Sequence, residues 1–194
     1  MSQVLLYHHV QGLTEGVRSF ADELRQAGHT VHTPDLFDGR TFETIDEGMA
    51  FAREMGFEAL GERGVAAADD IGPGVVYAGF SAGVMTAQQL AQTRPGARGA
   101  LLMYSCLPVS EFGAAWPEGV PVQVHGKESD EFFLEDIAAA RALVDSTDEA
   151  ELFLYPGTEH LFADSSLPTY DPAAAALLTD RALAFLATID AEND

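Results

Sequence analysis

Six short runs of apolar residues recur along the chain, and each ends near a glycine, a proline or a polar residue. Runs of this kind, rich in Val, Leu, Tyr or Phe, are typical of β-strands. Several are almost continuously apolar, as expected for strands that are covered on both faces. We therefore predict strands at residues 4–9, 29–33, 74–79, 100–105, 120–125 and 151–155.

Segments with apolar residues at helical spacing separate these runs. They lie at residues 17–27, 84–93 and 134–144 and near the C-terminal end of the sequence. In the last segment, Asp171 suits the N-cap and Pro172 the first helical position. One apolar stripe follows, formed by Ala175, Leu178, Ala182, Phe185 and Ile189.

Strands that alternate with helices predict an α/β fold with a doubly wound, mostly parallel sheet of about six strands and helices on both faces. A chain of 194 residues can bury one sizeable core but is too short for two typical domains. We therefore expect a single domain over residues 1–194. Residues 39–73 have no confident strand pattern, and we expect one or two helices there over the sheet edge.

Charge narrows the range of partners. Asp and Glu total 31 against 10 Lys and Arg, which gives a formal net charge of −21. Such a surface repels nucleic acid, anionic membranes and anionic small molecules. We find no uninterrupted apolar stretch of membrane-spanning length, no basic leader before Val4 and only one cysteine, Cys106. We expect a cytoplasmic protein without nucleic-acid or membrane partners; the oligomeric state stays open, and a homodimer is compatible with the sequence.

Residues 79–83 read Gly-Phe-Ser-Ala-Gly, directly after the third predicted strand and before the helical segment 84–93. This strand–turn–helix context is what a nucleophile elbow requires. The sharp turn projects the serine hydroxyl above the sheet, and the flanking positions favour glycine because side chains there would collide with backbone. The helix N-terminus favours a developing oxyanion. We interpret Ser81 as a nucleophile; the alternative is an ordinary glycine-rich turn.

A serine nucleophile needs a base, and the base needs an orienting carboxylate. Where such an elbow is used, the acid and then the histidine follow the serine along the chain. Asp130 and His160 lie just beyond the fifth and sixth predicted strands. Because the carboxyl ends of parallel strands share one edge, both side chains can reach Ser81. Glu128 and Glu131 stay open as alternatives to Asp130.

The other histidines are expected to be structural or peripheral. His29 and His32 flank a short strand, and His125 lies in or at the end of another. His8 and His9 end the first strand at the same edge as Ser81. Adjacent strand residues point to opposite faces, which argues against a metal site there, and we expect no metal.

Several segments match one family in order and spacing. They are residues 34–36, the elbow at 79–83 and residues 125–130, 155–163, 170–176 and 181–186. Through them the chain resembles the dienelactone hydrolase family over nearly its whole length. The resemblance implies a single-domain α/β-hydrolase that needs no cofactor.

The resemblance also implies roles for particular residues. The catalytic triad would be Ser81, Asp130 and His160. The oxyanion hole would be formed by the backbone N–H groups of Ala82 and of Val10, in the turn after the first strand. Within that resemblance, the expected activity is hydrolysis of a small carboxylic ester or lactone.

Departures from the family pattern bear on the substrate. Ser81 stands where the dienelactone enzymes use cysteine, and His9 takes the place of a glutamate that helps to ionise the thiol. Asp164 stands where they carry an arginine that binds the substrate carboxylate. We therefore take His9, Asp164 and the neighbouring Gln11 as pocket candidates and expect an uncharged substrate.

Two alternatives to that expectation stay open. Asp164 can instead face solvent and cap its loop, and Arg40, Arg53 or Arg63 can supply a replacement cation.

Two other functions compete with an esterase. One is a catalytically inactive protein that keeps the hydrolase fold for binding or regulation. The other is a flavodoxin-like phosphate or nucleotide binder, which the glycine-containing loop at residues 11–16 favours. No lysine follows that loop, and the net charge is strongly negative; both observations argue against binding of a phosphate group.

Overall fold

Six parallel strands form one sheet in the order β2-β1-β3-β4-β5-β6, in a computed structural model that describes residues 1–113 and 115–191. Every predicted strand is present, and its ends lie within two residues of those expected. The strands are β1 (Gln3–Tyr7), β2 (Thr30–His32), β3 (Val75–Phe80), β4 (Gly99–Met103), β5 (Val122–Lys127) and β6 (Ala150–Tyr155).

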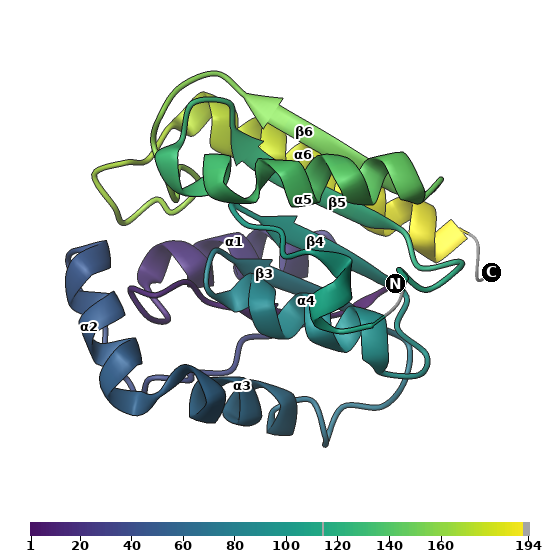
Figure 1. Cartoon of the computed structure of the whole chain (residues 1–194), viewed down its shortest axis with the longest axis horizontal. Coiled ribbons are helices and arrows are strands. Elements are labelled where there is room, and N and C mark those ends of the chain that lie inside the picture. The colour runs from purple at the N-terminus through teal and green to yellow at the C-terminus, as the bar shows by residue number, and fades with distance from the viewer. Residues whose placement is uncertain (114, 192–194) are drawn as a thin grey trace.

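Helices cover both faces of the sheet (Figure 1). Successive residues of a strand point to opposite faces, so Val4 and Leu6 of β1 join one core cluster, whereas Leu5 and Tyr7 join the other. α1 and α6 pack on the first face, and the remaining helices pack on the second. The helices are α1 (Glu15–Gln26), α2 (Ile45–Met55), α3 (Phe57–Ala66), α4 (Gly83–Thr93), α5 (Glu131–Ser146) and α6 (Pro172–Ala191), with a 3-10 turn at Val109–Glu111.

The stretch at residues 39–73 contains two helices, as predicted. The Thr44 hydroxyl accepts a hydrogen bond from the Glu47 N–H, the Glu47 carboxylate accepts one from the Thr44 N–H, and this capping box starts α2. Gly56, with φ of 89°, separates α2 from α3. α3 packs beside α4, and the Tyr7 hydroxyl of β1 donates to the Gly64 carbonyl of α3. Figure 1 shows α2 near the edge where the strands end.

The C-terminal helix α6 is a core helix. Its predicted stripe is buried, with Leu178, Ala182 and Ile189 almost fully inaccessible. Asp171 accepts hydrogen bonds from the N–H groups of Ala173 and Ala174 and so caps the helix as expected. α6 is also long and apolar enough to cross a membrane, with a mean hydropathy of 1.3. Length and composition alone do not distinguish a span from a core helix, and the packing of this stripe against the sheet accounts for its apolar character.

Candidate active site

Ser81 lies at the sharp turn between β3 and α4. Its φ of 49° is in the left-handed region, which is strained for a residue with a side chain. A Cβ at Gly79 would lie 2.5 Å from the backbone of Gly83, and one at Gly83 would lie 2.6 Å from the Tyr7 carbonyl oxygen. Both positions therefore require glycine for the turn to close, as the elbow pattern predicts.

His160 lies between a carboxylate and the serine hydroxyl. Its Nδ1 is 2.6 Å from Oδ2 of Asp130, and its Nε2 is 2.9 Å from Oγ of Ser81. With the proton on Nδ1, the ring donates to Asp130 and accepts from the serine. Glu128 and Glu131 are exposed, so the structure brings Asp130, and neither glutamate, to the histidine.

The carboxylate of Asp130 is held by the helix that follows it. The residue is fully buried and is the N-cap of α5, where its Oδ1 accepts a hydrogen bond from the Phe132 N–H. One oxygen is thus fixed by the helix and the other faces His160. The His160 ring in turn packs between the rings of Tyr104 and Phe132, with centroids 5.5 and 4.9 Å away.

Lys127 ties together the loops that carry these side chains. It ends β5 and is buried, and its Nζ donates to Glu159, 2.7 Å away, and to Asp171, 2.8 Å away. Glu159 precedes His160, and Asp171 caps α6. Burial alone would lower the pKa of Lys127, but these two hydrogen bonds outweigh it and raise that pKa. The ion pairs therefore keep the His160 loop near the end of β5.

Two residues with unpaired backbone N–H groups line the cavity beside Ser81. They are Val10 and Ala82. Among the residues that the structure describes, neither N–H has a hydrogen-bond acceptor in the protein. α2 supports the Val10 turn closely, since a Cβ on Gly48 would lie 2.2 Å from the Val10 carbonyl oxygen. Two unpaired donors beside a serine can hold an oxyanion.

The cavity at Ser81 has a volume of about 450 Å³ and is open to solvent. Its walls come from α2, the start of α4, the loop after β4, and α5. Its charged side chains are Asp46 and Arg53 of α2 and Glu135 and Asp136 of α5. The cavity around Ser81 is therefore lined by three carboxylates and one guanidinium.

Asp164 is not among the residues that line this cavity, contrary to the expectation that it would be a pocket residue. Its buried Oδ2 lies 2.7 Å from Nε2 of His9 and accepts from the Thr14 hydroxyl. Its Oδ1 accepts from the N–H and hydroxyl of Ser166. Desolvation raises the pKa of Asp164, but these hydrogen bonds outweigh it and leave that pKa below its usual value. The carboxylate caps its loop, as in the alternative reading, but it does so in the protein interior.

The Asp164 carboxylate also fills the N-terminus of α1. A Cβ on Gly16, in the first turn of α1, would overlap Asp164 Oδ1, and Thr14, which binds the same carboxylate, is the N-cap. A helix N-terminus that already holds an anion offers a phosphate neither free donors nor a favourable field. The loop at residues 11–16 is therefore not a phosphate site.

The two remaining pocket candidates lie near the site but not in the Ser81 cavity. His9 is buried, and its Nδ1 accepts a hydrogen bond from the Gln11 N–H, so it fixes the turn that carries Val10. Gln11 lines a neighbouring cavity of about 410 Å³ that His160 also lines, and its Nε2 donates to the Phe42 carbonyl.

The other histidines hold the structure together. His8 donates through Nδ1 to the His9 carbonyl and accepts through Nε2 from the Leu36 N–H, and burial lowers its pKa to about 4. His125 bonds Tyr155 and Gln123, and burial lowers its pKa to about 3. Among the described residues, no cluster of three or more His, Cys, Asp or Glu side chains is arranged to hold a metal ion.

Sequence reasoning missed most of the cavity wall. Of the three arginines considered, only Arg53 lines the cavity, whereas Arg40 lies over the Phe51 ring and Arg63 pairs with Asp38. The acids of α5 could have been found, because Asp130 caps the helix and its first turns must therefore lie beside the site.

The parallel sheet, the serine elbow and the histidine and carboxylate at successive strand ends define an α/β-hydrolase. A model of the dienelactone hydrolase family matches residues 1–190, and the chain belongs to that family. It is thus a dienelactone-hydrolase-like hydrolase of the carboxylic ester hydrolase type. No curated protein sequence matches the chain significantly.

Solved structures share the fold at low sequence identity. A dienelactone hydrolase-like promiscuous phosphotriesterase, P91, from metagenomic libraries has a TM-score of 0.73 and 16% identity, over 97% of this chain and 87% of that one. Dienelactone hydrolase from Anabaena variabilis has a TM-score of 0.65 and 20% identity, over 94% of this chain and 84% of that one. Mouse α/β hydrolase domain-containing protein 10 has a TM-score of 0.68 and 13% identity, over 97% of this chain and 90% of that one.

Proposed function

We propose that the protein hydrolyses a small, uncharged carboxylic ester or lactone through an acyl-enzyme formed on Ser81. The Ser81 hydroxyl oxygen attacks the acyl carbon while its proton passes to Nε2 of His160. The resulting oxyanion accepts hydrogen bonds from the N–H groups of Val10 and Ala82. His160 then gives the proton to the leaving alcohol oxygen, and water, activated in the same way, releases the acid.

One observation carries this proposal: His160 contacts Ser81 at 2.9 Å through one ring nitrogen and the buried Asp130 at 2.6 Å through the other. A nucleophile bonded to a base, and a base bonded to an orienting acid, are the arrangement that nucleophilic catalysis by serine needs. The carboxylate fixes the ring tautomer that accepts the serine proton and stabilises the imidazolium that forms.

The electrostatic surroundings support an uncharged substrate. Asp46, Glu135 and Asp136 outnumber Arg53 around the cavity, and the net charge of the chain is −21. A substrate carboxylate would meet repulsion both in the cavity and during its approach. The same negative charge argues against nucleic-acid and anionic-membrane partners. We also propose a cytoplasmic location.

The test is labelling with a fluorophosphonate together with ester hydrolysis, because an inactive binding protein with the same fold would show neither. Ser81→Ala should abolish labelling and lower kcat/KM for an aryl acetate by about a thousandfold or more. Ser105→Ala is the matched control: Ser105 lines the same cavity, but its hydroxyl donates to Asp136. It should keep both labelling and most of the activity.

Mass spectrometry of the protein mixed with a slowly hydrolysed ester should show an adduct of one acyl group on Ser81. Ester hydrolysis by Ser81→Ala near the unmodified rate would refute the assignment. Labelling at Ser105 in place of Ser81 would do the same.

A further inference from the structure

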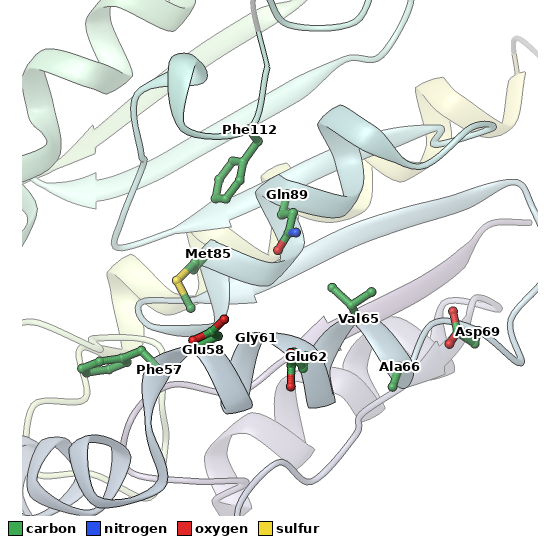
Figure 2. A pocket seen from close by; sticks show the side chains of 10 residues that line it. All are labelled: Phe57, Glu58, Gly61, Glu62, Val65, Ala66, Asp69, Met85, Gln89 and Phe112. Atoms are coloured by element: carbon green, nitrogen blue, oxygen red, sulfur yellow. The ribbon is translucent and has the colours of Figure 1, made fainter.

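A second sizeable cavity lies between α3 and α4, away from the triad. Its volume is about 580 Å³, against about 450 Å³ at Ser81. Figure 2 shows it as a groove along α3, with Phe57 and Met85 near one end and Asp69 at the other. Phe112, from the segment after β4, closes the side opposite α3.

This groove adjoins the cavity at the nucleophile. Phe57 and Met85 line both of them. Met85 follows Ser81 by four residues, about one turn of α4, so the groove starts next to the elbow. A molecule bound at Ser81 can therefore extend past these two side chains without leaving the protein surface.

The lining suits an apolar chain and repels an anionic one. Phe57, Val65, Met85 and Phe112 supply apolar surface, and the Phe57 side chain is 42% exposed although it is a large aromatic residue. The charged side chains of the groove are all carboxylates: Glu58, Glu62 and Asp69. Lys, Arg and His are absent from its described lining residues.

The position of His160 indicates which part of an ester would enter the groove. His160 must hand its proton to the leaving oxygen, so the alcohol lies on the His160 side of the cavity, which Phe132 and the acids of α5 also line. β3 carries Ser81 and has β4, β5 and β6 on the His160 side, whereas α3 packs with Tyr7 of β1 on the other side. The acyl substituent therefore points toward Met85 and Phe57.

We infer that the groove between α3 and α4 is an acyl-chain site, and that the substrate class extends from small esters to esters with an uncharged acyl chain of medium length. The inference rests on the proposed function, because it assigns the acyl half of that substrate. Each methylene that the groove buries raises kcat/KM by up to about fourfold.

Gly61→Leu tests the site from within α3. A Cβ at Gly61 has as its nearest neighbour the Met85 Cε, 4.0 Å away, so a leucine side chain fits and fills the groove. Gly61 lies inside a helix, where leucine is also the better helix former. Ala59→Leu is the control, since Ala59 is exposed on the same helix and does not line the groove.

The substrates are aryl esters of acetate, butyrate, octanoate and a carboxylate-ended octanoate analogue, all below the concentration at which they aggregate. The unmodified protein should prefer the octanoate to the acetate. Gly61→Leu should lower that preference about tenfold and leave acetate hydrolysis unchanged, whereas Ala59→Leu should change neither. The carboxylate-ended analogue should be the poorer substrate of the two long esters.

Each result separates this inference from the proposed function. Absence of acetate hydrolysis would refute the proposed esterase function itself. Acetate hydrolysis with no gain from longer acyl chains, or a gain that Gly61→Leu leaves intact, would overturn the groove assignment alone. A gain seen with octyl acetate but not with ethyl octanoate would place the alcohol in the groove and overturn the acyl assignment.

Discussion

Nε2 of His9 and Oδ2 of Asp164 lie 2.7 Å apart in the interior, and each side chain also holds a loop. His9 accepts from the Gln11 N–H, while Asp164 accepts from Thr14 and Ser166. A cavity-facing carboxylate at position 164 would have acted on the substrate directly. The observed pair instead joins the turn of Val10 to the loop that follows His160.

Removal of the Asp164 carboxylate should therefore cost stability. Asp164→Ala leaves the buried donors of His9 and Thr14 unsatisfied, and we expect a loss of about 3 kcal/mol in the free energy of unfolding. Asp164→Asn keeps one acceptor oxygen and should lose less, about 1–2 kcal/mol. Urea unfolding at neutral pH measures both, and an unchanged midpoint in Asp164→Ala would show that the pair does not hold these loops.

The acid of the triad can be tested against its neighbours. Asp130→Asn should lower kcat about a thousandfold, because the amide cannot stabilise the imidazolium and favours the wrong ring tautomer. Glu128→Gln and Glu131→Gln remove the same charge from exposed positions and should each stay within about twofold of the unmodified protein. Steady-state hydrolysis of an aryl acetate decides between them. A large loss only in a glutamate variant would move the role to that residue.

Charge selection should depend on the acids that line the cavity. Glu135→Gln should raise kcat/KM for a carboxylate-bearing ester about twofold to fivefold, since an exposed carboxylate contributes about 0.5–1 kcal/mol of repulsion. The neutral analogue of that ester should be unaffected. Asp145→Asn changes the net charge equally at an exposed position on the same helix and outside the cavity, so it isolates the general field. Equal gains in both variants would contradict a local effect.

The buried histidines predict acid sensitivity. Burial lowers the pKa of His8 to about 4 and that of His125 to about 3, against about 6.5 when unfolded. Below pH 6.5 the unfolded chain binds protons that the folded chain does not, so stability is complete above 6.5 and falls as the pH decreases to these values. Each histidine should contribute about 1.4 kcal/mol per pH unit inside that window.

Chemical unfolding between pH 7 and pH 4 measures this slope. His8→Gln and His125→Gln should each reduce the slope by about one proton, and the double variant by about two. Comparison among the variants removes the background from the many carboxylates. A slope that stays the same in both single variants would place the acid sensitivity elsewhere.

Which parts of the fold and the site could be predicted from the sequence depends on what each sequence pattern encodes. Strand positions and the places of Ser81 and His160 follow from apolar periodicity and chain order, so these could be chosen without coordinates, whereas the acid stays open among Glu128, Asp130 and Glu131. The direction of the Asp164 side chain could not be predicted, because Leu161 lies between it and His160 with a φ of 59° and turns the loop inward. Spacing along the chain does not encode such a turn.

The cavity wall was unpredictable for a related reason. α2 lies where it does because Gly48 permits contact with the Val10 carbonyl. Because this contact joins segments that are distant in the sequence, residues 39–73 carry no local pattern that would predict it and show only helical periodicity. The helices were therefore expected, but the roles of Phe57 and Arg53 became visible only once the packing was known.

Lys127 is the only lysine of the chain, and its amine is enclosed by Glu159 and Asp171. The folded protein therefore shields its lysine amine from acylating reagents. Modification of this amine requires the His160 loop to open and release the side chain. The rate of that modification, followed by intact mass, thus measures how often the structure opens beside the catalytic histidine.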